Sequence, residues 1–245
     1  MALNEKEFKS ELSKVFRENG LSSMLSEEKS DKFFTLTEIM LEENEKYNLT
    51  AITEPDKIIL NHYADCVAIA EKIPVGASII DVGCGAGFPT LPLAIVRSDL
   101  KILAVDSTEK RINYVKKTAE ILGLSGVKAV AMRAEDGAKM AEYREKFDIA
   151  TARAVANLRV LCELCLPFVK VGGKMLAMKG KNAEFEIPEA KKAIAVLGAK
   201  GAKLLNITLK GKGEEFIRPL IEIDKISKTH ASYPRPYAQI SKKPL

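Results

Sequence analysis

A glycine-rich loop preceded by an acid is the strongest chemical feature of the chain. It has the sequence Asp81-Val-Gly83-Cys-Gly85-Ala-Gly87-Phe-Pro, between an apolar run and a helical pattern. Glycines there let the backbone turn tightly and approach a ligand closely. The spacing G-x-G-x-G differs from the dinucleotide fingerprint G-x-G-x-x-G. Because the carboxylate of Asp81 favours the amino group of a methionine over a pyrophosphate, the loop indicates S-adenosylmethionine, with a nicotinamide dinucleotide as the alternative.

Acids follow the next two predicted strands. Asp106 ends the second strand, where a carboxylate accepts hydrogen bonds from ribose hydroxyls in related folds. The alternative is that Asp106 or Ser107 caps the next helix, and both roles can hold at once. Ala134-Glu135 follows the third strand, at the edge of the sheet where an adenine would lie. The alternative for Glu135 is a solvated acid at the start of a helix.

Arg153 follows the fourth strand at the same edge of the sheet. Its planar fork is suited to a carboxylate or a phosphate, and the alternative is a surface salt bridge. The segment Thr151-Ala-Arg153-Ala lacks the Asn/Asp-Pro-Pro-aromatic pattern of enzymes that methylate exocyclic amines, and no Pro-Cys pair supplies the nucleophile of cytosine-C5 enzymes. An atom with an available lone pair, such as guanine N7, needs neither, since orientation alone lowers a barrier by up to about 7–11 kcal/mol. We therefore expect no catalytic acid or base, and Arg153 is the candidate for positioning.

Strand and helix patterns alternate from Ser78 onward, and they place these residues at one sheet edge. The last two apolar segments, 202–209 and 216–223, are separated by only six residues, so they should form an antiparallel hairpin. We predict an α/β fold: a doubly wound, mostly parallel seven-stranded sheet of the methyltransferase type with an antiparallel C-terminal hairpin. The predicted parallel strands are 78–83, 101–106, 127–133, 147–154 and 172–180, and the predicted helices between them are 89–98, 109–123, 157–169 and 186–198.

An N-terminal helical extension precedes the sheet. Helices are predicted at Glu5–Glu18 and Ser26–Asn44, each with an apolar face, and Ser26 is a plausible cap. Residues 47–73 are predicted to be part loop and part helix. We therefore divide the chain into an extension at 1–73, a catalytic domain at 74–226 and a basic tail at 227–245.

Charge is distributed unevenly along the chain. Residues 1–73 carry 9 Lys and Arg against 15 Asp and Glu, whereas the remainder carries 29 against 18. The basic half suggests a polyanionic partner, although solubility alone would also explain it. We expect the target base to leave its stack and to meet Phe88 or Tyr47, unless these rings belong to the core. The candidate phosphate contacts are Arg111, Lys179, Arg235, Lys242 and Lys243.

Four cysteines and the absence of apolar runs limit the other possibilities. Cys162 and Cys165 have a metal-like spacing, but no second pair completes a four-ligand site. They lie in a buried helical pattern, so we interpret them as core residues and expect no metal site. The N-terminal segment is not a signal peptide, and no stretch approaches the roughly 18 apolar residues of a membrane span. We expect a cytoplasmic protein.

Together these segments resemble the bacterial family of 16S ribosomal RNA guanine-N7 methyltransferases, historically called glucose-inhibited division protein B. The resemblance runs from about Phe33 to the C-terminus and departs at Cys66, where the family usually has Ser, and in the tail, which lacks the family's Gly-x-Pro. The matching segments are Tyr47-Asn-Leu-Thr50, His62 and Asp65, DVGCGAGFPTLPLAI, VDSTEKR, RAED, TARAVANLRVLCELCLP and AMKG.

The resemblance implies methyl transfer from S-adenosylmethionine to N7 of a guanine in 16S ribosomal RNA, with the RNA or the small ribosomal subunit as partner. A small-molecule methyltransferase and a non-catalytic S-adenosylmethionine-binding RNA module are the alternatives. We expect a monomer. The cofactor contacts that the resemblance implies are Gly83, Phe88, Ala134, Glu135 and Arg153.

Overall fold

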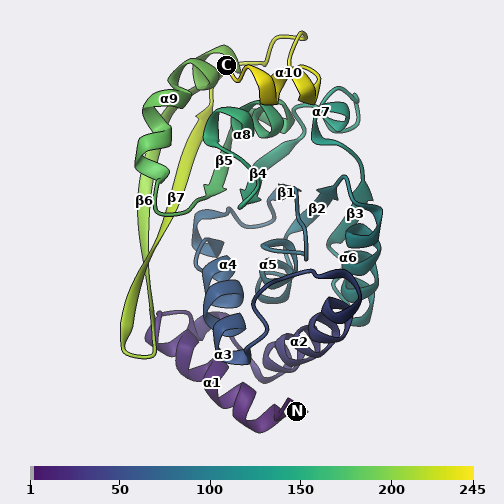
Figure 1. Cartoon of the computed structure of the whole chain (residues 1–245), viewed down its shortest axis with the longest axis vertical. Coiled ribbons are helices and arrows are strands. Elements are labelled where there is room, and N and C mark those ends of the chain that lie inside the picture. Colours follow the sequence, from purple (N-terminus) through teal and green to yellow (C-terminus); the bar gives the residue numbers. More distant parts are fainter. Residues whose placement is uncertain (1–2) are drawn as a thin grey trace.

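A seven-stranded sheet forms the centre of the structure, a computed structural model that describes residues 3–245 (Figure 1). The strand order is β3-β2-β1-β4-β5-β7-β6. Pairs among the first five strands are parallel, whereas β7 is antiparallel to both β5 and β6. The predicted fold class is confirmed. The strands are β1 (Ser78–Val82), β2 (Lys101–Asp106), β3 (Val127–Ala131), β4 (Phe147–Arg153), β5 (Val169–Met178), β6 (Ala199–Gly211) and β7 (Glu214–Lys225).

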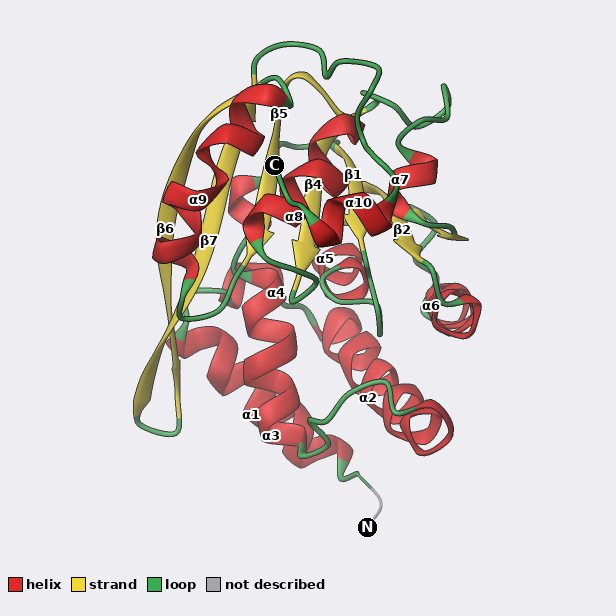
Figure 2. Ribbon diagram, turned by 45° about the horizontal axis from the view of Figure 1, so that its top comes forward, coloured by secondary structure: helices red, strands yellow, loops and turns green. Residues whose placement is uncertain are grey.

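Helices cover both faces of the sheet (Figure 2). Successive strand residues point to opposite faces, so Ile79 belongs to one buried cluster and Ile80 to the other. This double burial explains the continuous apolar runs of the strands. One face carries α5 (Thr90–Val96) and α6 (Glu109–Ile121), and the other carries α7 (Ala134–Gly137), α8 (Leu158–Cys165), α9 (Ala183–Val196) and α10 (Tyr237–Lys242).

The N-terminal helices share the core of the α5 and α6 face. Phe33 and Met40 are fully buried in the cluster that also contains Ile79 of β1. Ser26 caps the second helix as predicted, since its Oγ accepts from Lys29 N at 3.3 Å. The extension comprises α1 (Glu5–Glu18), α2 (Glu27–Tyr47), α3 (Pro55–Ile58), a π-helical turn (Ile59–Ala64) and α4 (Asp65–Val67), and short 3-10 turns lie at Ser22–Met24, Ala70–Lys72 and Leu166–Phe168.

The β6–β7 hairpin is longer than predicted. Its turn is only Lys212-Gly213, both with positive φ (53° and 79°), which is typical of two-residue hairpin turns. The six residues predicted as a loop are therefore mostly strand. At the tip, the Asn19 side chain donates to the Lys210 carbonyl at 2.8 Å and accepts from its N–H at 2.7 Å. The hairpin thereby reaches past the sheet to the end of α1 (Figure 1).

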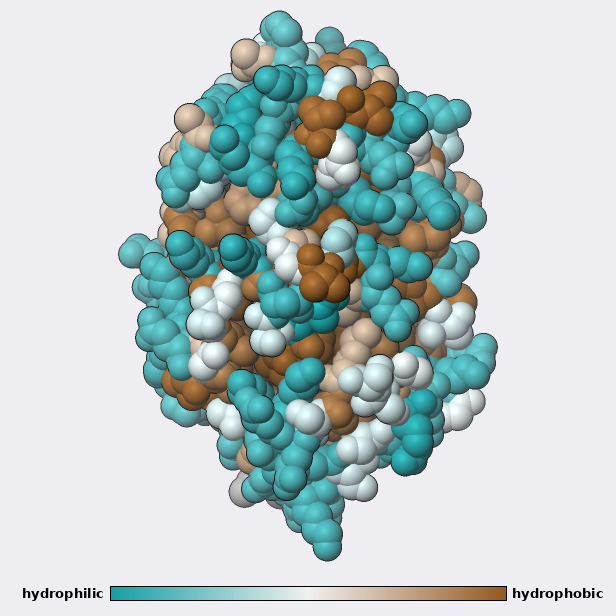
Figure 3. Space-filling view, turned by 180° about the vertical axis from the view of Figure 1, so that it is seen from behind, coloured by the Kyte–Doolittle hydropathy of each residue, from teal (hydrophilic) through white to brown (hydrophobic). Residues whose placement is uncertain are grey.

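The basic tail packs against the domain. Arg144 donates to the carbonyls of Thr229 and Tyr233 at 2.8 and 2.9 Å, and Ile240 of α10 is fully buried. On the face opposite the view of Figure 1, apolar side chains form separate small groups among hydrophilic ones (Figure 3). Within residues 3–245, no helix is both long enough and apolar enough to cross a membrane.

Candidate functional site

One cavity of about 580 Å³ lies at the carboxyl ends of the parallel strands. The glycine loop after β1 forms one wall, and the segments that follow β2, β3 and β4 form the others. Arg111, one of the predicted RNA contacts, lies at the same cavity. Of the eight predicted cofactor residues only Asp81 is not part of the lining, which contains Gly83, Gly85, Phe88, Asp106, Ala134, Glu135 and Arg153.

The loop requires glycine for two separate reasons. Gly83, Gly85 and Gly87 have φ values of 75°, 54° and 82°, a region that disfavours residues with a Cβ. A Cβ on Gly83 would also lie 2.8 Å from Cγ2 of Val155, and one on Gly87 would lie 2.5 Å from Cδ1 of Leu91. Both the backbone conformation and the close packing therefore favour glycine at Gly83 and Gly87.

Two acids line the cavity and are largely buried. The Asp106 carboxylate accepts hydrogen bonds from the N–H groups of Gly85 (3.1 Å) and Thr108 (2.8 Å). The first of these bonds connects the glycine loop to the end of β2. The next helix begins at Glu109 with Thr108 in the cap position, so neither Asp106 nor Ser107 is its cap. Glu135 is 6% exposed, unlike the solvated helix-start acid considered as its alternative.

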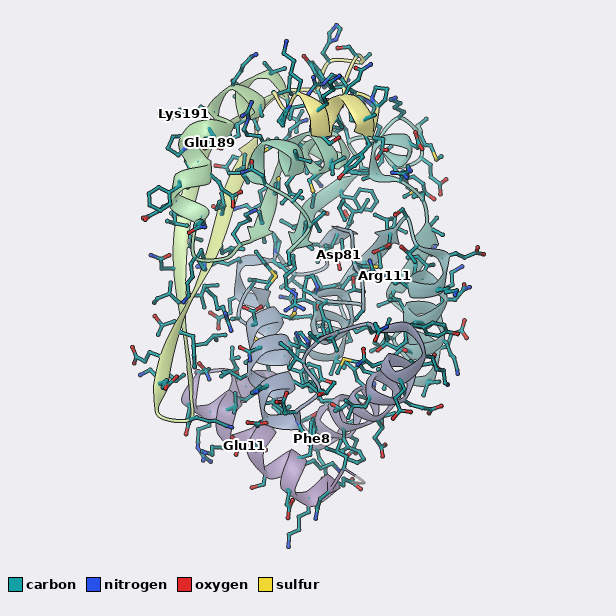
Figure 4. The ribbon with its side chains drawn as sticks, in the orientation of Figure 1. Phe8, Glu11, Asp81, Arg111, Glu189 and Lys191 are labelled. Carbon is teal, nitrogen blue, oxygen red and sulfur yellow. The ribbon has the colours of Figure 1, made fainter. Side chains whose placement is uncertain are left out.

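Asp81 lies beneath the loop and is fully buried. Its Oδ2 accepts from the Thr90 hydroxyl at 2.6 Å, whereas Oδ1 has no hydrogen-bond partner within residues 3–245. Burial raises the pKa of this carboxyl to about 6. In Figure 4, Asp81 and Arg111 lie near the centre of the molecule, at the strand ends that form the cavity. The role of Asp81 toward a cofactor amino group stays a prediction.

Arg153 is the centre of a partly buried network rather than of a surface salt bridge. Its Nη1 lies 3.3 Å from Oδ2 of Asp65 and donates to the Asn61 carbonyl at 3.1 Å. Its Nη2 donates to Nδ1 of His62 at 3.1 Å, and its guanidinium carbon lies 5.1 Å from the centre of the Phe88 ring. Asp65 in turn lies 3.5 Å from Nε of Arg218 on β7. The network joins the extension, β4 and the hairpin.

His62 connects this network to the cavity wall. It lies in the π-helical turn Ile59–Ala64, a distortion that often marks functional sites. Its ring is stacked on Phe88, with centroids 4.4 Å apart and planes at 23°. Nδ1 of His62 lies between Nη2 of Arg153 at 3.1 Å, which can only donate, and the carbonyl of Asn61 at 3.2 Å, which can only accept, and Nε2 lies 2.9 Å from the hydroxyl of Thr50. Burial, together with the charge of Arg153, lowers the pKa of His62 to about 3.

Several site residues had no predicted role. Thr50, His62 and Tyr237 line the cavity, and Asp65 and Arg218 hold Arg153. The signal for three of them was present, because Thr50, His62 and Asp65 lie in segments that carry the family resemblance. Nothing in the sequence pattern distinguishes Arg218 and Tyr237 from surface residues.

Two of the predicted RNA contacts are committed to internal carboxylates. Lys179 is only 10% exposed, and its Nζ lies 2.9 Å from Oε2 of Glu186. Arg235 donates to both oxygens of Glu163, at 2.8 and 2.6 Å, and Glu163 is fully buried. Arg235 neutralises a buried acid and Lys179 is itself largely buried, so neither position favours a phosphate contact, and the expectation of phosphate contacts at Lys179 and Arg235 is not supported.

The remaining RNA candidates keep exposed charges. Arg111 is 47% exposed and lies 3.5 Å from Oδ2 of Asp106. Lys242 and Lys243 are exposed at the end of α10.

Of the two rings proposed to stack on a target base, Tyr47 is 44% exposed beneath the ammonium group of Lys110. Phe88 is 4% exposed, with His62 stacked on its ring and Arg153 beside it, so its burial favours the core alternative, and stacking on a target base stays a prediction.

The cysteines lie in the core. Cys162 and Cys165 are both fully buried as free thiols in α8, as expected, and burial raises the pKa of each. Cys66 is equally buried next to Asp65. Over the described part of the chain, no group of three His, Cys, Asp or Glu side chains is arranged to hold a metal.

Solved structures share this fold at low sequence identity. An S-adenosylmethionine-dependent O-methyltransferase from Thermotoga maritima superposes with a TM-score of 0.51 at 18% identity, over 78% of this chain and 72% of the other. A geranyl diphosphate methyltransferase in complex with S-adenosylmethionine superposes with a TM-score of 0.50 at 15% identity, over 67% of this chain and 85% of the other. These similarities establish the fold alone.

Sequence relatives are far closer. The ribosomal RNA small subunit methyltransferase G of Clostridium perfringens is 44% identical over 90% of this chain and 92% of its own length. That of Acetivibrio thermocellus is 42% identical over 99% of this chain and 100% of its own. The family model described as rRNA small subunit methyltransferase G matches residues 29–216. The chain therefore belongs to the rRNA small subunit methyltransferase G family.

Proposed function

We propose that this protein transfers a methyl group from S-adenosylmethionine to N7 of a guanine in the 16S ribosomal RNA of the small ribosomal subunit. The observation that carries the proposal is the cavity behind Gly83, with Asp106, Glu135 and Arg153 at the ends of three successive strands. Relatives that cover nearly the whole chain are named for methylation of small-subunit ribosomal RNA. We expect the protein to act as a monomer and in the cytoplasm, where ribosomes are found.

The residues of the cavity fit S-adenosylmethionine. The glycine loop presents bare backbone to the cavity, since a Cβ on Gly83 would lie 2.8 Å from Cγ2 of Val155, which also lines the cavity. Asp106 and Glu135 are acceptors for ribose and adenosine donors. Arg153 is a rigid fork for the carboxylate of the methionine moiety, and Asp81 supplies an acid beneath the loop for its amino group.

The chemistry requires position rather than acid–base catalysis. S-adenosylmethionine, when bound, supplies a methyl group on a positively charged sulfur, and guanine N7 presents a lone pair. The protein therefore has to hold both groups in line and to exclude water. The Arg153 guanidinium contacts Asp65, His62, Asn61 and Phe88, so it is oriented before a ligand arrives. The lowered pKa of His62 means that its imidazole does not add a second positive charge beside Arg153 at neutral pH.

The deciding experiment is transfer of label into RNA. Small ribosomal subunits that lack the modification are incubated with the protein and methyl-labelled S-adenosylmethionine, and the RNA is digested to nucleosides. We expect label in 7-methylguanosine. Label in a different nucleoside would overturn the target atom, and label in a metabolite rather than RNA would support a small-molecule methyltransferase. No turnover despite binding of S-adenosylhomocysteine would support the non-catalytic module.

The cofactor is tested separately by calorimetry. We expect S-adenosylhomocysteine to bind and NAD not to bind, because the loop has an acid and the G-x-G-x-G spacing. Binding of NAD without S-adenosylhomocysteine would favour the nicotinamide alternative.

A further inference from the structure

A second cavity, of about 720 Å³, adjoins the first. The two share His62, Arg153 and Ala154 as a common wall. A transferase needs its acceptor next to its donor, so a cavity across a shared wall from the glycine loop is where an acceptor would lie. Met178, Ile207 and Leu220 give this cavity apolar surfaces, which suit the faces of a planar base.

The polar part of the second cavity is a lysine next to a carboxylate. Lys179 and Glu186 both line it, with Nζ of Lys179 2.9 Å from Oε2 of Glu186. The same Oε2 accepts from the N–H of Leu158 at 2.6 Å, whereas Oε1 has no hydrogen-bond partner in the described chain. Nζ of Lys179 also donates to the Ala156 carbonyl at 2.6 Å, so one of its three N–H bonds remains unassigned. The pair thus offers one donor beside one acceptor.

Guanine carries the complementary arrangement on the edge beyond N7. The O6 acceptor comes first, then the N1–H donor, then the N2 amino donor. A carboxylate oxygen accepts from N1–H and N2–H, and an ammonium group donates to O6. Bases without the N2 amino group leave part of this acceptor unused, and an unpaired buried carboxylate oxygen is costly.

We propose that the second cavity receives the target guanine and that Glu186 and Lys179 select it there, Glu186 through N1–H and the N2 amino group and Lys179 through O6. The inference rests on the proposed function and names the residues that recognise its substrate. Lys179, which is not placed to contact a phosphate, would instead donate to O6 of the guanine.

The test compares Glu186→Gln with Glu189→Gln. Glu189 lies on the same helix and is exposed at the outer rim of the molecule, so it is the matched control (Figure 4). The guanine that the wild-type protein methylates is first located in the RNA. Subunits are then reconstituted with guanine or inosine at that position, since inosine keeps N7, O6 and N1–H but lacks the N2 amino group. kcat/KM is measured for both RNAs, and the affinity for S-adenosylhomocysteine is measured by calorimetry.

We expect Glu186→Gln to lower kcat/KM on guanine RNA by about 5- to 150-fold, the range of a good base-edge contact. Its S-adenosylhomocysteine Kd should stay within about twofold of wild type, and Glu189→Gln should behave as wild type. Wild-type protein should prefer guanine to inosine by at least about fivefold. In Glu186→Gln this preference should shrink, which a purely structural role would not produce.

Three results would overturn the inference. The first is a kcat/KM of Glu186→Gln on guanine RNA equal to that of the wild-type protein. The second is that Glu186→Gln loses kcat/KM by the same factor on guanine RNA and on inosine RNA. The third is that the wild-type protein has the same kcat/KM on both RNAs. The last comparison needs no variant, so the inference is testable even if Glu186→Gln fails to fold. A wild-type protein that places no label in RNA would instead overturn the proposed function, and the inference with it.

Discussion

Arg153 and Asp65 lie 88 positions apart in the chain and form a 3.3 Å ion pair that joins β4 to the N-terminal extension. Asp65 is also 3.5 Å from Arg218 of the hairpin, so one carboxylate faces two guanidinium groups. Burial raises the pKa of Asp65, and both arginines oppose that rise. The extension therefore completes the site as well as the core.

Replacement of Asp65 tests this connection. We expect Asp65→Asn to lower the free energy of unfolding by about 1–3 kcal/mol, because two partly buried guanidinium groups lose their carboxylate. Turnover should fall at least about tenfold as Arg153 loses its orientation. Urea denaturation and single-turnover methylation measure the two effects. Glu71→Gln, at an exposed acid of the same extension, is the control. Wild-type turnover in Asp65→Asn would show that Arg153 is held by its other partners.

Gly83→Ala tests the glycine wall of the cavity. The new Cβ would lie 2.8 Å from Cγ2 of Val155. The alanine would also have to adopt a positive φ, which is unfavourable for a residue with a Cβ. We expect the affinity for S-adenosylhomocysteine to fall at least about tenfold in calorimetry, beyond a backbone strain of about 1 kcal/mol. Gly123→Ala isolates that strain, since Gly123 has φ +64° with nothing within 4 Å of the added Cβ. Equal ligand affinity in both variants would contradict a cofactor wall at Gly83.

The buried imidazole of His62 predicts a pH dependence of stability. Its pKa is lowered from 6.5 to about 3, so between these values the unfolded chain binds more protons than the folded one. The stabilisation is complete above about pH 6.5 and is lost as the pH falls toward 3. The loss is on the order of 5 kcal/mol. Burial raises the pKa of Asp81 from 3.8 to about 6. Between these two values the folded chain binds more protons than the unfolded one, so the contribution of Asp81 to the unfolding free energy falls as the pH rises.

Variants separate the two histidines of the chain. His62→Gln should have a flatter unfolding free energy between pH 4 and 6.5 than the wild-type protein, whereas His230→Gln, at an exposed position, should keep the wild-type slope. Urea denaturation at half-unit pH intervals measures both. A slope unchanged by His62→Gln would place the acid sensitivity elsewhere.

The tail separates RNA binding from folding. Lys242→Glu with Lys243→Glu should raise the apparent KM for small subunits and reduce its dependence on salt by about one unit of log–log slope per lost phosphate contact. Melting temperature and S-adenosylhomocysteine affinity should be unchanged, because both lysines are exposed. Arg235→Gln should instead lower the melting temperature, since it leaves the buried Glu163 without its partner. A KM unaffected by the lysine reversals at any salt concentration would remove the tail from RNA binding.

Local patterns in the sequence were sufficient for most of the fold. Strand periodicity and the glycine loop place Asp106, Glu135 and Arg153 at one edge, and the structure brings them to one cavity. These predictions work because parallel strands end at the same side of a sheet. The predicted hairpin was shorter than the observed one. Its two-residue turn was not recognised because Lys212, a residue type that seldom adopts positive φ, shares the turn with Gly213.

Long-range pairing was beyond the sequence patterns. Lys179 and Arg235 look like free surface charges until Glu186 and Glu163, 7 and 72 positions away, are placed against them. His62 meets Arg153 from 91 positions away, through a π-helical turn that no periodicity indicates. A charge alone does not reveal whether its partner is a solvent molecule, a phosphate or an internal acid.

The cavity is lined by residues from Leu49 to Tyr237, which has a consequence for how the protein is made. During translation, the His62 segment leaves the exit tunnel long before Arg153, and the Arg218 and Tyr237 segments follow later still. The nascent chain thus has no finished binding site until residue 237 has emerged.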